Sequence, residues 1–414
     1  MPFIPRGSHR SLFPVILAVL GLFPAATPAT ELEVLYIGDP FGSSPYFALE
    51  GEPGIRLHPV PAFTMANSYP SDWGKRIMRA YFPRSYGELS DLQVILLSDV
   101  RMDLFTAREL EWMSESVLED GNGLAMIGGL DSFSGVGDNS GHLSPVGSLI
   151  PVTGGEPNWA SAWISWFDED DPFMARLPFG ELGEKGAFSG FNLVEEKPGS
   201  SAVAYLESQA GSSPLISYWE VGAGLGFAFT SEWKGDTLAS FCRTPEECHL
   251  RGTRWGNQFA SWSYAPDFTR NLVYLLARSP FPDDPSGPHL FRAKTDEYDL
   301  GMSLALLQVE VLDRLGVPTG GIEVVMDGAR VSYGEARELY ESGLLEESLD
   351  RIDEALSQLS SVGPVSSRLE EEHLMWMYLV QAATVASVAI LVGLVYERAS
   401  SGYHRRDGAK KREE

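Results

Sequence analysis

Two short apolar runs, Leu92-Gln-Val-Ile-Leu-Leu-Ser98 and Leu124-Ala-Met-Ile127, decide the fold. Runs of this length that are almost continuously apolar are typical of strands buried on both faces of a parallel sheet. Between them, Thr106-Ala-Arg-Glu109 is a capping box that starts a helix, and Asp120-Gly-Asn-Gly123 supplies a glycine that ends it. A strand, a helix and a strand joined by short turns predict a parallel βαβ unit.

The α/β pattern extends outward from this unit over residues 30–279. Residues 33–38 form a β-branched and aliphatic run that ends in a turn. Residues 215–220 and 225–230 form two further runs that a glycine-rich turn separates, which predicts an antiparallel hairpin. A closing helix is expected over residues 268–277. We therefore expect one α/β domain over residues 30–279.

The N-terminus has the pattern of a secretory signal peptide. Arg6 and Arg10 precede the apolar run Leu12–Phe23, and small residues follow as far as Ala29. The run is shorter than the roughly 20 residues that span a bilayer. We therefore expect residues 1–29 to be a cleaved signal peptide, with an uncleaved N-terminal anchor or a disordered tail as the alternatives.

The C-terminus has the pattern of a membrane anchor. Residues 374–396 are apolar over a length that reaches roughly 34 Å as a helix, enough for the hydrocarbon core. Residues 397–414 are rich in arginine and lysine, as is typical of a tail kept in the cytoplasm. Together the two ends predict a single-pass membrane protein with the N-terminal domain outside and a short cytoplasmic tail.

The net charge of the chain excludes one class of binding partner. Its 414 residues include 57 acidic and 31 basic ones, for a formal net charge of -26. A protein that binds a phosphate backbone needs a basic face, so we expect no nucleic-acid partner. Because the C-terminal tail is basic, the acidity belongs to the part of the chain predicted to lie outside the membrane.

A helical segment joins the α/β domain to the predicted anchor. The proline-rich stretch that opens residues 280–299 predicts a linker, and residues 300–373 predict a helical stalk. Within the stalk, residues 332–359 resemble one tetratricopeptide-like helical hairpin. A single unit of this kind cannot bury its apolar face alone. It is therefore expected to pack on the α/β domain, on the preceding helix or on another envelope protein.

Three stretches resemble the class I glutamine amidotransferase-like proteins, in the putative-amidotransferase branch near the trehalose-utilisation-type domains. They are Gln93-Val-Ile-Leu-Leu-Ser-Asp99, the stretch Glu119-Asp-Gly-Asn-Gly-Leu-Ala-Met-Ile-Gly-Gly129 with Ser132 and Phe133 after it, and Glu220-Val-Gly-Ala-Gly-Leu-Gly-Phe-Ala-Phe-Thr-Ser231. The resemblance covers the α/β domain and none of the stalk. It implies a flavodoxin-like, mostly parallel sheet with helices on both faces.

The same resemblance locates the position of a nucleophile. Working members of the superfamily carry a cysteine on the sharp turn between a strand and a helix, with a histidine and a glutamate supplied later. The matching turn here holds Gly128 and Gly129, and glycine offers no nucleophile. The resemblance therefore favours a protein that is not an enzyme of this type.

The two cysteines, Cys242 and Cys248, lie far from that turn. Outside the membrane they are expected to form a disulfide. The alternative is a free thiolate with His249 as its base. A reactive thiolate needs an electropositive environment, whereas Glu246 and Glu247 adjoin these residues, so the disulfide is favoured.

Acidic residues follow several of the predicted strands. Ligands of open α/β sheets bind at the carboxyl ends of the strands, where carboxylates could hold a divalent cation or hydrogen-bond a sugar. An aspartate after a strand more commonly caps the next turn, and this interpretation is favoured. No cofactor and no metal site are predicted. The candidate ligand edge comprises Asp39, Asp99, Gly128, Gly129, Asp131, Glu232 and Trp233.

Two groups of aromatic residues leave their role open. Aromatic side chains cover partner surfaces or stack on ligands, but they also fill cores, and the sequence does not separate these uses. The first group is Trp159, Trp163, Trp166 and Phe167, and the second is Trp255, Phe259, Trp262 and Tyr264.

These patterns predict a membrane-anchored extracytoplasmic module of amidotransferase-like fold that is catalytically inactive. It would bind or scaffold other proteins of a cell-envelope complex through its helical stalk. The alternative is an envelope hydrolase or sugar-processing enzyme that uses the carboxylates at the strand ends.

Overall fold

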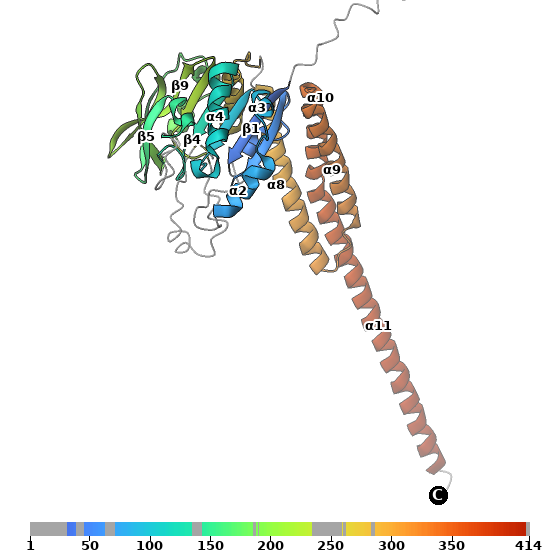
Figure 1. The fold of residues 1–414 in the computed structure, drawn as a ribbon. Helices are drawn as coiled ribbons and strands as arrows, with labels where there is room; N and C mark the ends of the chain where they lie inside the picture. Colours follow the sequence, from blue (N-terminus) through green and yellow to red (C-terminus); the bar gives the residue numbers. More distant parts are fainter. Residues whose placement is uncertain are drawn as a thin grey trace, which may run out of the picture. The chain divides into compact units, whose positions relative to one another are not determined.

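The structure is a computed structural model in which the chain divides into two units, each described here by itself (Figure 1). The first unit comprises residues 1–167, 187–257 and 276–279, and the second comprises residues 168–186, 258–275 and 280–414. The structure describes residues 31–38, 45–62, 71–134, 143–184, 188, 190–233, 259, 262–282 and 286–410.

The first unit is built on an eight-stranded sheet in the order β2-β1-β3-β4-β10-β9-β8-β6. The five strands from β2 to β10 are parallel, and β9, β8 and β6 continue the sheet in antiparallel pairs. A separate antiparallel pair joins β5 to β7. The strands are β1 (Leu32–Gly38), β2 (Ile55–Pro61), β3 (Val94–Ser98), β4 (Gly123–Ile127), β5 (Val152–Asn158), β6 (Ala162–Phe167), β7 (Phe191–Glu196), β8 (Ser201–Ser208), β9 (Gly211–Val221) and β10 (Gly224–Phe229).

The predicted βαβ unit is confirmed. It consists of β3, the helix α4 (Ala107–Glu115) and β4, and the two strands pair in parallel with Val94 opposite Gly123. The capping box forms, since the Thr106 hydroxyl accepts from the Glu109 amide and the Glu109 carboxylate accepts from the Thr106 amide. A π-helical turn, η2 (Ser116–Asp120), extends α4, and Gly121 ends it at φ 86°, a conformation that glycine adopts without strain.

Both faces of the parallel strands are buried. One face packs against α2 (Ser71–Tyr81), α3 (Tyr86–Ser90) and α4, which lie in front of the sheet in Figure 1. The alternate residues of β1 and β3 are buried as well, so these strands have no solvent face. The first face is formed by Leu35, Ile37, Ile95, Leu97, Leu124 and Met126, and the helices contribute Met78, Leu89 and Met113, with Phe82 directly after α2.

The predicted hairpin of β9 and β10 is confirmed, with Gly222 at φ 60° in its two-residue turn. The sequence reading did not identify β2. This strand contains Pro59 and Pro61, which argue against a central strand because proline cannot donate to the ladder. They are tolerated because β2 is the edge of the sheet.

Lys197 connects the end of β7 to the loop that precedes β5. Its ammonium donates to the Gly147 carbonyl at 2.5 Å and to the Ile150 carbonyl at 2.8 Å, and it lies 5.6 Å from the centre of the Trp219 ring. Burial lowers the pKa of this lysine. Two carbonyls and an aromatic face therefore replace the water that the charge has lost.

The substitution Lys197→Met tests this connection. It keeps the aliphatic stem but removes both charged hydrogen bonds, so we expect the free energy of unfolding to fall by about 2 kcal/mol. Denaturant titration followed by tryptophan fluorescence measures the change. The same substitution at Lys75, a half-buried lysine of α2, is the control and is expected to cost less than about 0.5 kcal/mol. If Lys197→Met and Lys75→Met lower the free energy of unfolding equally, the hydrogen bonds of Lys197 do not stabilise the fold.

The second unit is helical. The linker expected over residues 280–299 is wrong for most of its length, because α8 already begins at Ser286. Pro288 lies in the first turn of this helix, where a missing amide hydrogen costs nothing, so the proline marks a helix start. The helices are α5 (Gly180–Glu184), most of α7 (Ala265–Leu276), α8 (Ser286–Arg314), α9 (Gly320–Glu341), α10 (Leu345–Ser360) and α11 (Val362–Lys410).

Helices α8, α9 and α10 form a bundle that α11 continues. Along α8, Lys294 pairs with Asp353, Gly301 lies beside Leu359, and the Ser366 hydroxyl donates to Gln308. The partners differ in number by 58 or 59 residues each time, so α8 runs parallel to a line formed by α10 and the start of α11. The described hairpin of α9 and α10 therefore buries its face against the preceding helix, one of the three arrangements expected.

Stacked aromatic rings join α8 to α9, which runs in the opposite direction. The rings of Phe291 and Tyr340 lie 4.1 Å apart and nearly parallel, and those of Tyr298 and Tyr333 repeat the arrangement two turns further along. Just beyond Tyr340, at the C-terminal end of α9, Gly343 adopts φ 77° in the short turn to α10. These contacts fix the register of the bundle.

The stacked pair at the start of the bundle can be measured by a double-mutant cycle. We expect Phe291→Ala and Tyr340→Ala each to lower the free energy of unfolding by about 3 kcal/mol, with a coupling of about 1 kcal/mol between them. Leu359 lies beside Gly301, roughly 15 Å along α8 from Phe291. The pair Phe291→Ala and Leu359→Ala should therefore be additive within about 0.5 kcal/mol. If the coupling between Phe291→Ala and Tyr340→Ala is no larger than that between Phe291→Ala and Leu359→Ala, the stacked rings do not stabilise the bundle.

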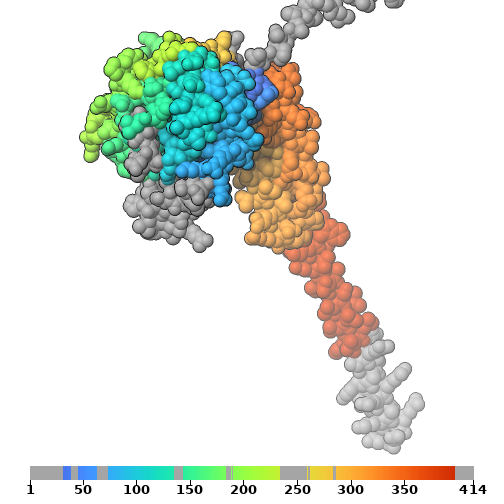
Figure 2. Space-filling view, in the orientation of Figure 1, coloured from blue at the N-terminus to red at the C-terminus, as the bar shows by residue number. Residues whose placement is uncertain are grey.

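Helix α11 is long and apolar enough to cross a membrane. The apolar window lies in the helical stretch 345–396, and none of it is buried by the rest of the chain, unlike a core helix. Figure 2 shows it standing alone beyond the bundle. Because α11 runs without a break from Val362 through residues 374–396, the bundle and the apolar segment share one continuous helix.

Candidate functional site

The turn after β4 is the position where the amidotransferase resemblance predicts a nucleophile. Asp99, directly after the neighbouring strand β3, organises this turn: the Asp131 amide donates to its Oδ1 at 2.8 Å. Asp99 adopts φ 51° and is 5% exposed, and Asp131 is 2% exposed. The Ser132 hydroxyl donates to the Ile127 carbonyl at 2.5 Å. The side chains of Asp99 and Ser132 are thus engaged with the backbone of this turn.

Asn192 of β7 holds the turn from a second side. Its Oδ1 accepts from the Gly129 amide at 3.0 Å, and its Nδ2 donates to the carbonyls of Gly129 at 3.1 Å and Gly155 at 3.0 Å. The side chain is fully buried. Sequence reasoning missed this residue, and its one signal was a polar side chain inside the apolar run that follows Phe191.

These contacts leave no room for a side chain at the turn. A Cβ on Gly129 would lie 2.1 Å from the carboxyl carbon of Asp99, and a Cβ on Gly128 would lie 2.7 Å from Asn192 Oδ1 and from the Thr230 carbonyl carbon. Real Cβ atoms essentially never approach other heavy atoms so closely. A cysteine is therefore excluded here by space as well as by sequence.

Of the described carboxylates of the predicted edge, Asp99 and Asp131 meet in the turn, where both are buried. Arg101 lies near them: its hydrogen bonds to Asp103 raise the pKa of the guanidinium, and the charge of Asp131 adds to this effect against the cost of burial. Among the residues that the structure describes, no group of three or more His, Cys, Asp or Glu side chains could hold a metal ion.

The remaining predicted residues divide between packing and parts outside the description. Trp233 is buried, with its ring 5.3 Å from that of Phe229, and Glu232 beside it is partly exposed. Four predicted residues and the predicted signal peptide lie outside the described residues, so the disulfide stays a prediction. These four are Asp39, Cys242, Cys248 and Trp255.

The two aromatic groups have different surroundings. Trp159, Trp163 and Trp166 are each about half exposed, at 49–52%, on and just before the edge strand β6. Phe259 and Trp262 are buried in an aromatic cluster around Phe268 of α7. Phe259 and Trp262 of the second group therefore belong to the core, whereas the three tryptophans of the first group lie on the surface.

A buried acidic residue that the sequence reading missed connects α7 to α8. Asp267 lies with Oδ2 2.9 Å from His289 Nδ1 and Oδ1 2.5 Å from the Arg292 guanidinium. The Tyr264 ring stacks on the His289 ring at 3.9 Å. The carboxylate is 3% exposed, so its two partners compensate for the water it has lost. No motif in the sequence predicts this group, since it depends on how the helices pack.

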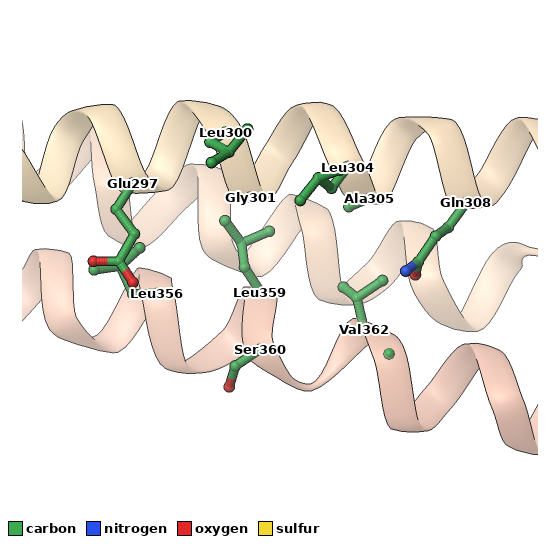
Figure 3. A pocket seen from close by; sticks show the side chains of 11 residues that line it. Glu297, Leu300, Gly301, Leu304, Ala305, Gln308, Leu356, Leu359, Ser360 and Val362 are labelled. Carbon is green, nitrogen blue, oxygen red and sulfur yellow. The ribbon is translucent and has the colours of Figure 1, made fainter.

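An open groove of about 310 Å³ runs along the bundle between α8 and the line of α10 and α11 (Figure 3). Leu300 and Leu304 of α8 lie on one side of it, and Leu356 and Leu359 of α10 on the other. Small residues, including Gly301 and Ser360, also line it, with Glu297 and Gln308 among the polar ones. Such a surface suits an apolar side chain of a partner better than a charged ligand.

Comparisons with known proteins add little to this description. No family model matches the sequence, and no curated protein matches it. Among solved structures, the cytoplasmic protein STM3548 from Salmonella typhimurium is similar over 59% of this chain and 99% of its own, with 20% identity and a TM-score of 0.42. The cytoplasmic protein STM1381 from Salmonella typhimurium LT2 covers the same shares at 16% identity and a TM-score of 0.41. Similarities this distant leave the function to be argued from the chain itself.

The closed turn after β4 predicts that a methyl group added at Gly129 destabilises the fold. We expect Gly129→Ala to lower the free energy of unfolding by about 3 kcal/mol or more, because the new Cβ overlaps the Asp99 carboxyl. Adding Asp99→Gly removes the overlapping atoms and should recover part of that loss. Thermal denaturation of the single and double variants measures both effects.

Gly87 of α3 provides the matched control, since a Cβ there meets no atom within 4 Å. Gly87→Ala is expected to be neutral or slightly stabilising, because alanine favours a helix. A tolerated Gly129→Ala, or a double variant less stable than Gly129→Ala alone, would show that the turn has room.

Proposed function

We propose that this protein is a membrane-anchored extracytoplasmic module of amidotransferase-like fold that binds or scaffolds other proteins of a cell-envelope complex and is catalytically inactive. The observation that carries the proposal is the closed turn after β4. Gly128 and Gly129 occupy the nucleophile position, and Asp99, Asn192 and Thr230 fill the space that a nucleophile would need. A nucleophilic mechanism at this turn has neither the reactive atom nor room for it.

The flavodoxin-like part of the proposal is supported by strand order. The five parallel strands lie in the order β2-β1-β3-β4-β10, which follows the 2-1-3-4-5 order of flavodoxin-like sheets. In such sheets ligands bind outside the carboxyl ends of the strands, near the point where the order reverses. In this chain the described carboxylates at the ends of β3 and β4, Asp99 and Asp131, are buried in the turn.

The location is supported by the two ends of the chain and by α11. Residues 1–29 would direct export, residues 374–396 would cross the membrane, and the basic residues 397–414 would remain in the cytoplasm. The exposed apolar window of α11 supports the crossing. This topology places the acidic α/β unit and the helical bundle outside.

A glutamine analogue tests the absence of catalysis. A diazoketone analogue of glutamine alkylates the cysteine nucleophile of a working amidotransferase, so the purified full chain should show no covalent adduct by intact-mass spectrometry. It should also release no ammonia from glutamine above the buffer rate. A working glutaminase treated with the same reagent is the positive control.

An adduct on Cys242 or Cys248 would overturn the inactive assignment, because it would identify a thiolate elsewhere in the chain. The binding role has its own readout, the proteins that co-purify with the detergent-solubilised full chain. If the chain is recovered alone, monomeric and without a bound partner, the scaffolding role fails.

A further inference from the structure

Helix α8 has a second apolar face that the bundle leaves exposed. Leu300, Leu304, Leu307 and Val311 are each between 52% and 63% exposed. Their spacing is four, three and four residues, the heptad spacing of a coiled-coil seam. An isolated exposed leucine would need no explanation, whereas an apolar row at this spacing is typical of a helix that packs against another helix.

This row is separate from the face that α8 uses inside the bundle. Tyr298, Ala305 and Leu312 are buried and follow one another every seven residues, in the core with α9 and α10. Seven residues are close to two helical turns, so these three share one side of α8. The exposed row lies on another side. The bundle is therefore packed without the exposed row, and a partner could cover the row without disturbing the core.

The groove makes the same surface self-complementary. Leu300 and Leu304 belong both to the exposed row and to the wall of the groove (Figure 3). Across from them the groove is lined by the small residues Ser360, at the end of α10, and Gly363, at the start of α11, and a Cβ built on Gly363 meets no atom within 4 Å. A ridge of leucines on one side of a groove with small residues on its other side offers both a knob and a hole. A two-fold axis would place each copy's ridge in the other's groove.

The apolar segment of α11 independently indicates that two copies of this chain associate. Ala382, Ala386, Ala389 and Gly393 repeat the spacing of four, three and four residues inside the segment 374–396. Small residues in such rows let membrane helices approach closely and associate. Because α11 is continuous with the bundle, helices that associate in the membrane would bring the bundles of two copies together.

We propose that the exposed face of α8 pairs with the same face of a second copy of this chain, giving a parallel two-fold dimer. The inference rests on the proposed function, since it names one partner of the binding module. Anchoring in one membrane orients all copies alike, so two copies meet with their α8 helices parallel and Leu304 opposite Leu304.

Cysteine cross-linking tests the pairing on the full chain in lipid nanodiscs. In a background with Cys242→Ser and Cys248→Ser, Leu304→Cys should form a disulfide-linked dimer under mild oxidation. The control is Val324→Cys on α9, which is more exposed, at 72%, but lies outside the seam. Equal cross-linking at the two positions, or none at Leu304→Cys, would overturn the proposal.

A second measurement keeps the native cysteines. Sedimentation of the detergent-solubilised chain should show a dimer, and Leu304→Asp with Leu307→Asp should weaken it by about tenfold or more, since each charge would be buried in the seam. Val324→Asp with Val331→Asp, at exposed positions of α9, should leave it unchanged. Unchanged thermal stability of both double variants would show that the bundle still folds.

The outcomes separate this inference from the proposed function. A monomeric wild type, or a dimer unaffected by Leu304→Asp with Leu307→Asp, refutes the pairing. If those changes instead release a different co-purifying protein, the row binds that protein, so the pairing fails while the binding role stands. A glutamine-analogue adduct together with an intact dimer would refute the inactive assignment and leave the pairing in place.

Discussion

The hydrogen bonds that Asn192 and Asp99 make to the turn after β4 constrain the first unit most. A buried amide that satisfies three backbone groups at once cannot move without leaving several of them unpaired, and each such group costs on the order of 1–3 kcal/mol. The bonds therefore hold Gly128 and Gly129 where a Cβ atom would overlap neighbouring atoms. Precise packing at this point and a nucleophile at this point exclude each other. At this point Asp99, Asn192 and Thr230 fill the space beside the two glycines.

The second unit follows a different constraint, the continuity of one helix from the bundle into the apolar segment. Stacked rings and the Asp267 cluster fix α8 against α9 and α7, and the line of α10 and α11 lies parallel to α8. Without a flexible linker between bundle and span, the membrane would set the direction of the bundle axis. In the proposed anchoring, the exposed row on α8 would face along the membrane plane, where other anchored proteins are concentrated. This is the physical basis for proposing that binding lies in the helices, since the described turn after β4 has no room for a side chain at Gly128 and Gly129.

Local signals predicted the elements that depend on neighbouring residues. The capping box at Thr106, the glycine that ends η2 and the turn at Gly222 are each set by a few adjacent residues, and all three formed as expected. The failures have equally specific causes. Proline was taken as the mark of a linker before α8, yet Pro288 lies in a first helical turn, where an amide hydrogen is not required. The strand β2 was not predicted, and its Pro59 is tolerated because β2 is the edge of the sheet.

The sequence by itself determined the parallel βαβ unit, the apolar segment near the C-terminus and the absence of a cysteine at Gly128 and Gly129. Only the tertiary structure decided what surrounds these features. Asn192 lies 63 residues from Gly129, and Asp267 lies 22 residues from His289, so no local pattern announces either contact. Periodicity shows that a side of a helix is apolar, as in α8, but not which of its apolar rows the fold buries. That choice depends on long-range packing, which assigned Tyr298, Ala305 and Leu312 to the core and left the leucine row outside.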